Sequence, residues 1–558
     1  MDTFADVVLA RAGDEAVGVV SDNERLTWGE VVQQAADRAA FLSGMRAAGR
    51  QVHVGLLLEN VPGYLFWTCA AALAGAVVVG INPTRRGREL AGDIRHTDCD
   101  LIVTEDRLAG LLGEPDNGGL DHGVPPACVL NVDDPGHAGL LSPYRGAGLP
   151  SVLPDPGAAL LLLFSSGSTG APKAVICSQG RLGMLARTMR ERTELTRESV
   201  SYLSMPLFHG NSMMMNFAPS LYAGATLCLA RRFSASGFVR DVHRYRVTFA
   251  NYVGRALSYV LAVPEDPRDR GSTLELAAGT EASVPDVERF SARFGCRVSE
   301  GYGQSEGMVR INRTPGAPPG SIGLPVGGAE VRVLSEETGQ ECPPARFDAD
   351  GRLLNAGDAT GQIVVIGAAA RFEGYYKNPR AQAERVRGAD FWTGDLAYRD
   401  QAGYFYFAGR SSDWLRVDSE NFAAGPVERI IERWADVATG LVYAVPDPRT
   451  GDQVMCALRM ADGVAFDPRA FAAYLDAQPD LGTKWRPRFV RIIEHVPTTG
   501  TNKTTKTGLR REAWLTSDPV YWRQGPRSGY RRLRAAEREA LAREFARHGR
   551  AALLPVGR

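Results

Sequence analysis

The N-terminal part of the chain alternates between stretches with helical hydrophobic spacing and short runs of apolar residues. Helical spacing covers residues 27–47 and 88–97, and apolar runs at 52–58 and 101–104 have the length of buried strands. Alternation of this kind is typical of helices layered on mostly parallel strands. The pattern therefore predicts an α/β fold, and it returns over residues 181–313.

One stretch without charged residues, 64–81, is close to the shortest length that can cross a bilayer. Within it, Gly75 stands before the β-branched run Val77–Val79, and Pro62 precedes the whole stretch. Glycine commonly ends helices, and β-branched residues favour strands. We therefore expect a buried helix followed by a buried strand, although peripheral contact with a membrane surface stays open.

The middle of the chain begins with residues 113–156, which are rich in Gly, Pro, Asp and Ser and predict loops. The apolar run 158–164 then has no polar interruption, as expected of a strand buried on both faces. Strand-like runs dominate from 330 to 409, before helical spacing returns at 427–434 and 467–475. This change of pattern predicts a large N-terminal domain and a smaller C-terminal α/β domain.

Composition narrows the class of protein. Apolar residues make up 44% and charged residues 23%, as in ordinary globular proteins. The 64 Lys and Arg residues balance 64 Asp and Glu residues, which argues against a dedicated nucleic-acid binder. The eight cysteines lack the close spacing of a zinc site or disulfide scaffold, and the N-terminus lacks a secretory pattern. We therefore expect a cytoplasmic protein.

A loop rich in glycine and hydroxyl groups directly follows the apolar run 158–164. Small residues let the backbone curl tightly, and many donors together with one lysine suit a polyphosphate. The loop differs from the common P-loop, which has four residues between its glycines and ends in Lys-Ser/Thr. We predict that it binds nucleotide phosphates through Ser165, Ser166, Gly167, Ser168, Thr169, Gly170 and Lys173.

This loop resembles the signature of the adenylate-forming superfamily, which includes acyl-CoA synthetases, luciferases and peptide-synthetase adenylation domains. Other motifs of the superfamily follow in the same order along nearly the whole chain: Pro206–His209, Gly301–Glu306, Thr393–Asp395, Gly409–Arg410 and Pro497–Lys503. The resemblance implies an N-terminal AMP-binding domain of layered β-sheets and helices over residues 1–412. It also implies a hinge at Asp413 and a small mobile C-terminal α/β domain over 413–558.

The resemblance also implies roles for single residues around ATP. Tyr302 stacks near adenine, Ser305 contacts the α-phosphate, and Glu306 is a ligand of Mg²⁺. Gly303 belongs to the same nucleotide-binding motif. Further implied contacts are those of Gly279, Thr280 and Glu281 with adenine and those of Asp395 and Arg410 with the ribose.

Lys503 matches the lysine that acts in adenylation, and with Ser305 and Glu306 it completes the predicted catalytic residues. Serine stands at 305 where the family usually has threonine, but it keeps the hydroxyl. Asn502 stands where glycine precedes the lysine in most relatives. Asparagine tolerates a left-handed backbone better than most residues, so we expect the turn to persist.

On the acyl side, the resemblance places His209 beside the acyl pocket, and Met213 and Tyr252 are candidate pocket residues. Methionine side chains adapt to large or irregular ligands. Ordinary core packing explains the run Met213–Met215 at least as well.

Three stretches, 232–236, 251–254 and 413–421, look most like the very-long-chain acyl-CoA synthetase and fatty-acid-transport branch of the superfamily. In relatives, the last of these lines the tunnel for the pantetheine arm of CoA. The resemblance therefore implies that Arg416, Ser419 and Glu420 lie on the CoA side, although glycine commonly stands where this chain has Ser419.

The tail from residue 522 is rich in arginine, and Leu533, Leu541 and Phe545 fall near helical spacing within it. We favour an amphipathic helix that docks on the protein with a solvated basic face. The alternative is a contact with acidic lipids or with the phosphates of CoA.

The reaction that the resemblance implies joins a small-molecule carboxylic acid to CoA through an acyl-adenylate, with ATP and Mg²⁺. The predicted acid is long-chain or otherwise bulky and apolar, and a polycyclic or terpenoid acid is as admissible as a fatty acid. Two alternatives are an acyl-AMP ligase that loads a carrier protein and a fatty-acid uptake or binding protein. The sequence carries no signal for the oligomeric state.

Overall fold

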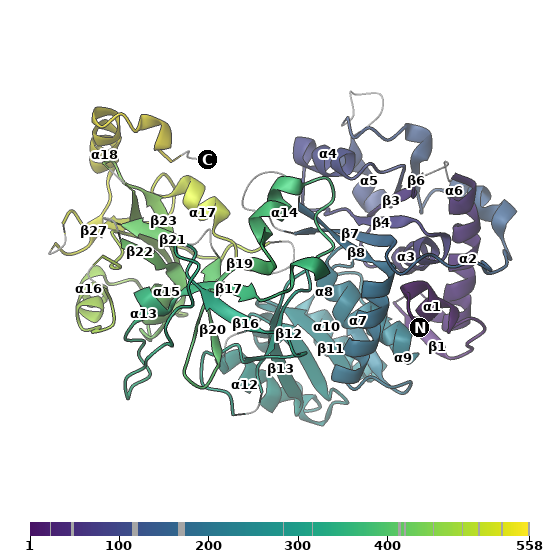
Figure 1. The fold of residues 1–558 in the computed structure, drawn as a ribbon. Helices are drawn as coiled ribbons and strands as arrows, with labels where there is room; N and C mark the ends of the chain where they lie inside the picture. Colours follow the sequence, from purple (N-terminus) through teal and green to yellow (C-terminus); the bar gives the residue numbers. More distant parts are fainter. Residues whose placement is uncertain are drawn as a thin grey trace. The chain divides into compact units, whose positions relative to one another are not determined.

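The computed structural model describes residues 1–22, 24–45, 50–113, 121–165, 173–282, 284–314, 316–410, 414–417, 420–449, 451–482, 484–499, 503–525 and 528–555. The chain divides into two compact units (Figure 1). Unit 1 consists of residues 1–310 and 369–386, and unit 2 of residues 311–368 and 387–558. The predicted domain boundary at Asp413 lies outside the described residues and stays a prediction.

Unit 1 contains a six-stranded sheet with the strand order β6-β5-β3-β4-β7-β8. Neighbouring strands run parallel except for β8, which runs antiparallel to β7. Helices cover both faces of such sheets, which explains the unbroken apolar runs in the sequence. The strands are β3 (His53–Leu57), β4 (Val77–Gly80), β5 (Leu101–Thr104), β6 (Val129–Asn131), β7 (Ala159–Ser165) and β8 (Lys173–Ser178). The expected strands at 52–58, 101–104 and 158–164 are confirmed.

The second sheet of unit 1 has the strand order β13-β12-β11-β9-β10-β1-β2. All of these neighbours are parallel except β1 and β2. The strands are β1 (Val17–Val20), β2 (Arg25–Thr27), β9 (Val200–Leu203), β10 (Thr226–Leu229), β11 (Phe249–Val253), β12 (Leu276–Thr280) and β13 (Arg297–Gly303). This is the α/β region expected over 181–313.

One large cluster of buried side chains joins both sheets of unit 1, from Val54 in the first to Leu227 in the second, through the helices between them. These helices include α1 (Phe4–Leu9), α2 (Trp28–Met45), α3 (Pro62–Ala74), α7 (Gln179–Arg192) and α9 (Ala218–Ala223). A second cluster packs the other face of the second sheet against α10 (Ala235–Tyr245), α11 (Ala256–Leu261) and α12 (Val284–Phe294). The remaining helices of unit 1 are α4 (Gly87–His96), α5 (Asp106–Ala109), α6 (Pro135–Leu141), α8 (Gly210–Ser212) and α14 (Pro379–Arg385).

The uncharged stretch 64–81 forms the helix and strand expected from its sequence. Helix α3 ends at Gly75, whose φ of 68° is left-handed and whose N–H bonds to the carbonyl of Ala71. Strand β4 then begins at Val77. Within the part of the chain that the structure describes, no helix is both long and apolar enough to span a membrane.

The expectation of loops over 113–156 is wrong in part, because β6 and α6 lie in this stretch. The Gly, Pro, Asp and Ser content predicted loops throughout, but Asp134 and Pro135 begin a helix. The Asp134 carboxylate accepts a hydrogen bond from the N–H of Gly136, at 2.7 Å, and Pro135 occupies the first turn. Proline is tolerated there because the N–H it lacks would have no helical partner.

Unit 2 contains a five-stranded sheet, a hairpin of β21 and β22, and a second five-stranded sheet with the order β23-β24-β25-β26-β27. In the first sheet, β17 lies antiparallel to β16 and β19, and β20 pairs with β19. The strands of these sheets are β16 (Val331–Leu334), β17 (Gly361–Val365), β18 (Val386–Arg387), β19 (Asp390–Arg399), β20 (Phe405–Arg410), β21 (Trp414–Val417), β22 (Glu420–Ala423), β23 (Val437–Pro446), β24 (Asp452–Met460), β25 (Phe489–Ile492), β26 (Val520–Trp522) and β27 (Arg531–Arg532). An antiparallel pair, β14 (Arg310–Asn312) and β15 (Leu324–Pro325), precedes them along the chain.

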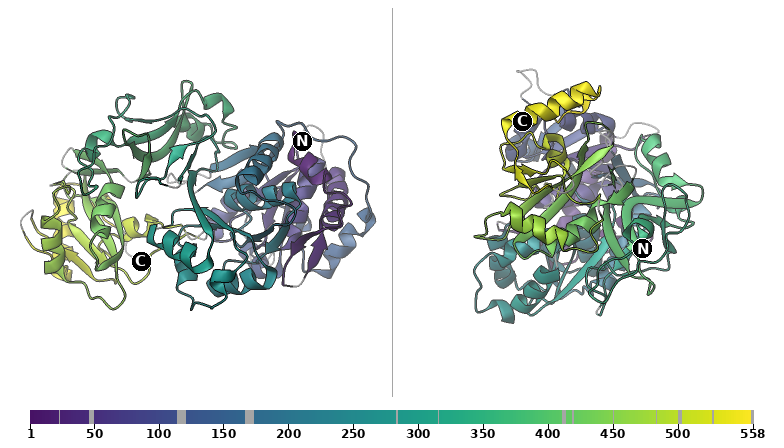
Figure 2. Two further views of the ribbon diagram at one scale, coloured as in Figure 1. Left: turned by 90° about the horizontal axis from the view of Figure 1, so that it is seen from below. Right: turned by 90° about the vertical axis from the view of Figure 1, so that its left-hand side faces the viewer.

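Most helices of unit 2 pack on the C-terminal sheet, and the arginine-rich tail forms one of them. They are α13 (Ala356–Ala359), α15 (Ala424–Glu432), α16 (Pro468–Asp476), α17 (Thr507–Glu512) and α18 (Ala535–Arg547). Figure 2 shows α18 in yellow beside the strands of its own unit. Leu541 and Phe545 are buried against Trp514. The docked amphipathic helix expected for the tail is therefore confirmed.

Candidate active site

Most motif residues of unit 1 lie at one edge of its second sheet. Strands β9, β11, β12 and β13 are parallel neighbours, so their carboxyl ends meet at that edge. Ligands of open α/β sheets bind at such edges. The residues that lie on or directly after these carboxyl ends are His209, Tyr252, Gly279, Thr280, Glu281, Tyr302, Gly303, Ser305 and Glu306.

Tyr252, Gly279 and Glu300 form a row across three neighbouring strands. Tyr252 on β11 is in register with Gly279 on β12, and Gly279 is in register with Glu300 on β13. A Cβ atom at residue 279 would lie 2.6 Å from the Tyr252 ring, so only glycine leaves room for that ring. The Tyr252 hydroxyl crosses the middle strand and donates a hydrogen bond to Glu300. Burial first, and the nearby Glu300 second, raise the pKa of Tyr252, so this hydroxyl stays a donor.

The phosphate-binding loop predicted between β7 and β8 has its ends fixed by strand pairing. Ser165 ends β7 in register with Lys173, which begins β8. Ser166–Gly170 lie outside the described residues. Lys173 is 5% exposed, and its Nζ lies 3.3 Å from a carboxylate oxygen of Glu384 and 6.0 Å from the Tyr375 ring centroid. The phosphate loop thus ends in a cation that two residues of segment 369–386 hold in place.

Glu306 is nearly buried, and the Tyr375 hydroxyl donates a 2.6 Å hydrogen bond to its Oε1 atom. The backbone before it is also held, because Arg181 donates to the carbonyl oxygen of Ser305. A Cβ atom at Gly210, the residue after His209, would lie 3.7 Å from the Ser305 hydroxyl. The structure therefore places the segments of His209 and Ser305 next to each other, as the predicted site requires.

The chemistry of Glu306 fits the Mg²⁺ that the resemblance implies. Mg²⁺ is usually bound by one or two carboxylates and by the phosphates of the substrate, without a dedicated protein cage. The described residues contain no group of three or more His, Cys, Asp or Glu side chains arranged for a metal. A single carboxylate such as Glu306 is the kind of ligand that a Mg²⁺ shared with ATP needs.

Segment 369–386 runs beside β8 and was not recognised as part of the site from its sequence. Tyr375 forms an antiparallel bridge with Val175 on β8. The N–H of Ile176 donates to the Gly374 carbonyl at 3.2 Å, and the N–H of Tyr376 donates to the Ala174 carbonyl at 2.8 Å. Contacts between residues so far apart along the chain leave no local pattern, so no sequence signal pointed to them.

In unit 2, Asp395 and Arg410 lie opposite each other on β19 and β20. The Arg410 Nε atom is 3.9 Å from an Asp395 carboxylate oxygen. Just before Asp395, the N–H of Gly394 donates to the Gln362 side chain, and Gly394 has a left-handed φ of 73°. The two predicted ribose contacts are therefore neighbours, while their roles stay predictions.

Lys503 also lies in unit 2, where backbone contacts join residues 498–499 to residues 503–504. The Thr499 N–H donates to the Lys503 carbonyl at 2.7 Å, and Thr498 bridges to Thr504. Asn502 lies outside the described residues. Lys506, the nearest other lysine, has its Nζ 2.7 Å from Glu428 on α15 and is largely buried.

The predicted hinge and CoA-side residues are only partly described. Asp413 and Ser419 lie outside the described residues. Arg416 lies on β21 opposite Asn421, and Glu420 lies on β22 opposite Val417. Their proposed part in CoA binding stays a prediction.

On the acyl side, the methionine run forms one turn of π-helix, Met213–Phe217. Such turns are rare and often occur at functional sites. The Met213 side chain is 1% exposed and belongs to the large core of unit 1. His209 begins the preceding short helix, and its ring lies 4.4 Å from that of Phe208, centroid to centroid. A role of either residue in binding the acid stays a prediction.

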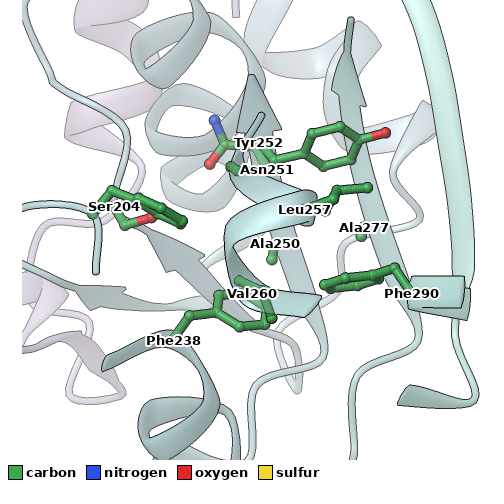
Figure 3. A pocket seen from close by; sticks show the side chains of 11 residues that line it. Ser204, Phe238, Ala250, Asn251, Tyr252, Leu257, Val260, Ala277 and Phe290 are labelled. Atoms are coloured by element: carbon green, nitrogen blue, oxygen red, sulfur yellow. The ribbon is translucent and has the colours of Figure 1, made fainter. Parts of the chain in front are cut away.

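A small apolar cavity lies behind Tyr252 (Figure 3). Its walls come from β11, α10, α11 and α12, and Figure 3 shows Phe238, Val260 and Phe290 on the side away from Tyr252. Its volume is about 10 Å³, which is roughly the room for one water molecule. Pockets for drug-sized ligands measure about 300–1,000 Å³. A bulky acyl group can enter this region only if its wall side chains move.

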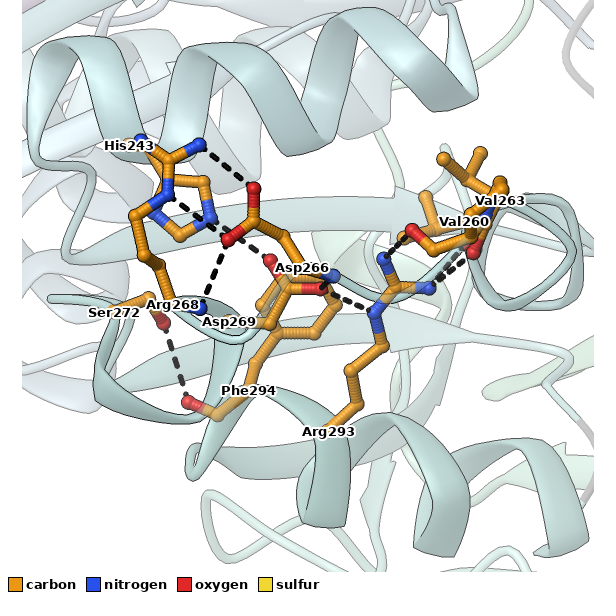
Figure 4. Close-up of polar contacts among 10 residues, drawn as sticks. His243, Val260, Val263, Asp266, Arg268, Asp269, Ser272, Arg293 and Phe294 are labelled. Atoms are coloured by element: carbon orange, nitrogen blue, oxygen red, sulfur yellow. Dashed lines mark hydrogen bonds and ion pairs between the residues drawn. The ribbon is translucent and has the colours of Figure 1, made fainter.

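A buried arginine fixes the far wall of this cavity (Figure 4). Arg293 on α12 donates to the carbonyls of Val260 and Val263 near the end of α11, at 3.0 and 2.7 Å. It also bonds to Asp269, at 2.7 Å, and both side chains are 2% exposed. His243 on α10 contacts the same carboxylate at 2.8 Å. Through Asp269, the side chains of Arg293 and His243 thus connect all three helices that line the cavity.

We predict that Arg293→Met lowers the free energy of unfolding of unit 1 by about 3–5 kcal/mol, because Asp269 would keep a buried charge without its main partner. Urea unfolding followed by tryptophan fluorescence measures this change. Arg268→Met is the matched control, since Arg268 pairs with Asp266 in the same loop but is 71% exposed. Its unfolding midpoint should stay near that of the wild type. Equal effects of the two variants would contradict the anchoring role of Arg293.

Comparison with known proteins agrees with this geometry. Residues 5–376 match the AMP-binding enzyme family. The chain is 47% identical to a steroid-22-oyl-CoA synthetase of Rhodococcus jostii over 99% of both chains. It is 40% identical to the medium/long-chain-fatty-acid–CoA ligase FadD17 of Mycobacterium marinum, over 92% of this chain and 97% of that one.

The fold matches that of ATP-bound MatB from Rhodopseudomonas palustris with a TM-score of 0.77, at 22% identity, over 91% of this chain and 98% of that one. This likeness confirms the expected fold of layered α/β sheets with a small C-terminal α/β sheet. Because the family match runs from residue 5 to residue 376 and takes in the motifs gathered at one sheet edge, the chain belongs to the AMP-binding enzyme family of adenylate-forming enzymes.

Proposed function

We propose that this protein is an AMP-forming ligase that joins a bulky, apolar carboxylic acid, in the first place a steroid acid, to CoA. The observation that carries the proposal is the gathering of His209, Tyr252, Tyr302, Ser305 and Glu306 at the carboxyl ends of four parallel strands. The 47% identity to a steroid-22-oyl-CoA synthetase, which extends over nearly the whole length of both chains, supports both the reaction type and the class of acid.

In the first half-reaction, a carboxylate oxygen of the acid attacks the α-phosphorus of ATP. The bond to the β-phosphate breaks, pyrophosphate leaves, and an acyl-adenylate forms. Negative charge grows on the phosphate oxygens, so donors and cations held in place stabilise the transition state. Ser305 would donate its hydroxyl to the α-phosphate, and Lys173 and Lys503 would supply positive charge. Bound Mg²⁺, held by Glu306 and the phosphates, would neutralise further charge.

In the second half-reaction, the sulfur of CoA attacks the acyl carbon, and AMP leaves with the electrons of the bond that breaks. The thiol gives up its proton to solvent. Because AMP is a good leaving group, correct positioning of the two reactants can be enough without a dedicated base. The residues that would lie on the CoA side are Arg416, Ser419 and Glu420.

The apolar side chains around Tyr252 fit a hydrophobic acid, and a large acid requires them to move. The cavity side chains are mainly aromatic and aliphatic, and they belong to helices at one face of the second sheet. A fatty acid is the second candidate, because a medium/long-chain-fatty-acid–CoA ligase is also similar over nearly the whole chain. Membership of the very-long-chain branch, a cytoplasmic setting and peripheral membrane contact are finer parts of the proposal that rest on sequence patterns.

A panel of acids tests the proposal directly. A steroid-22-oic acid, palmitate, octanoate and benzoate would each be incubated with ATP, Mg²⁺ and CoA, with AMP release and thioester mass as readouts. We expect kcat/KM to be about tenfold higher or more for the steroid acid.

Each other outcome of the panel removes a different part of the proposal. Equal or better use of palmitate would replace the steroid by a fatty acid. AMP release without a CoA thioester would favour loading of a carrier protein. No AMP release with any acid would refute the ligase.

We predict that Asp395→Ala weakens ATP binding by about tenfold to a hundredfold, because hydrogen bonds to a charged acceptor contribute about 1.5–3 kcal/mol. Isothermal titration with ATP measures the affinity. Asp390→Ala is the control, since Asp390 begins the same strand and accepts a backbone hydrogen bond from Gly367. Unchanged ATP affinity in the Asp395 variant, or an equal loss in both variants, would show that the ribose lies elsewhere.

We predict that Lys503→Ala separates the two half-reactions. Adenylate formation should fall by about two orders of magnitude, comparable to the loss of one strong transition-state contact. Synthetic acyl-adenylate supplied with CoA should still be converted at a near wild-type rate. Single-turnover assays of each half-reaction measure the two rates.

Lys506→Ala is the matched control, because that lysine is bound to Glu428. Both half-reactions should persist in this variant. If the Lys503 variant loses both half-reactions while folded, Lys503 also serves thiol transfer. If only the Lys506 variant loses adenylation, Lys506 is the adenylation lysine of this chain.

A further inference from the structure

Tyr375 lies between two groups that the proposed function assigns to the nucleotide. Its hydroxyl donates to Glu306 at 2.6 Å, and its ring centroid is 6.0 Å from Nζ of Lys173. Glu306 follows β13 in the second sheet, whereas Lys173 begins β8 in the first. Tyr375 itself lies in segment 369–386, which belongs to unit 1 although the preceding residues 311–368 belong to unit 2. One side chain thus connects three parts of the sequence at this point.

The Tyr375 side chain is held firmly enough to orient another residue. It is 3% exposed, and its ring meets that of Phe372 edge to face, with centroids 5.1 Å apart. Two backbone hydrogen bonds, on either side of Tyr375, fasten the segment to β8. Neighbouring Glu373 adds to this by accepting the Ser178 N–H at 2.9 Å. The phenol oxygen therefore has a fixed position relative to the sheets of unit 1.

We propose that Tyr375 is a positioning residue whose hydroxyl sets the orientation of the Glu306 carboxylate for the metal–nucleotide complex. The inference rests on the proposed function, which makes Glu306 the Mg²⁺ ligand. A carboxylate has about four lone-pair sites, so one hydrogen bond at Oε1 leaves capacity for a cation. Without that bond, a nearly buried carboxylate would populate other rotamers, and each binding event would have to restore the productive one.

Tyr375→Phe tests the proposal, because it removes the hydroxyl and keeps the ring that packs on Phe372. We expect the affinity for ATP in the presence of Mg²⁺ to fall about tenfold. The affinity for ATP in EDTA should change less than about twofold, and the Mg²⁺ concentration at half-saturation should rise. Isothermal titration with and without Mg²⁺ measures these quantities without relying on turnover.

Tyr376→Phe is the matched control on the same segment. The Tyr376 hydroxyl donates to Asp98 at 2.7 Å and contacts no predicted nucleotide residue in the described structure. Tyr375→Phe loses the hydrogen bonds of its hydroxyl with Glu306 and Arg385, and Tyr376→Phe loses the one with Asp98, so both should lower the thermal midpoint slightly. Only Tyr375→Phe should change the Mg²⁺ dependence. Equal changes in the two variants would overturn the proposal, because they would mean that Tyr375 merely fastens the segment.

Combining Tyr375→Phe with Glu306→Gln decides whether Tyr375 acts through Glu306. Glu306→Gln alone should weaken Mg²⁺-dependent ATP binding, since a neutral amide oxygen is a poorer ligand for this cation. The double variant should bind Mg²⁺ and ATP within about twofold of Glu306→Gln, because the effects of coupled residues do not add. Additive losses would overturn the positioning role while the metal assignment stands. If Glu306→Gln leaves the Mg²⁺ dependence unchanged, the metal assignment fails, and the role of Tyr375 fails with it.

Discussion

Parallel pairing of β9, β11, β12 and β13 is the constraint on which the rest of the site depends. A parallel neighbour can be reached only through a crossover, and here helices supply the crossovers. Motifs that lie far apart in the sequence therefore arrive at the same edge of the sheet, each at the end of its own strand. The strand register is strict enough to place Tyr252, Gly279 and Glu300 in one row. Position 279, in the middle of that row, requires glycine because the Tyr252 ring leaves no room for a side chain there.

Buried charges in unit 1 occur where backbone groups or opposite charges hold them. Arg293 donates to two carbonyls near the end of α11 and binds Asp269 as well. Burial alone would raise the pKa of Asp269, but hydrogen bonds from the Asp266 N–H, His243 and Arg293 outweigh burial and lower it. The carboxylate therefore stays charged at neutral pH. The ion pair of Arg293 and Asp269 holds the helices behind the cavity in place. The side chains that line the cavity itself are mainly apolar.

The strands and most helices could be predicted because their signals are local. An unbroken apolar run predicted β7, and a glycine before β-branched residues predicted the end of α3. Helix α6 was missed because the Gly- and Pro-rich composition of its region indicates loops, although Asp134 and Pro135 also suit the start of a helix. In the site, motif residues were identified one by one through resemblance. Their partners Tyr375, Glu384 and Arg181 were not, because contacts separated by 69, 211 and 124 residues leave no periodic trace.

The two faces of strand β11 have different surroundings, so the proposed acid-binding side can vary in sequence without affecting the reaction. Successive side chains of a strand point to opposite faces. Asn251 belongs to a network of amides, in which it accepts a 2.7 Å hydrogen bond from Asn216 in the π-helical turn. Tyr252, the next residue, packs with the helices on the other face, where the apolar cavity lies. The motifs that we propose to contact the nucleotide lie at the strand ends, whereas α10, α11 and α12 contribute side chains to the cavity. Substitutions in those helices would therefore reshape the proposed space for the acid while the sheet edge stays as it is.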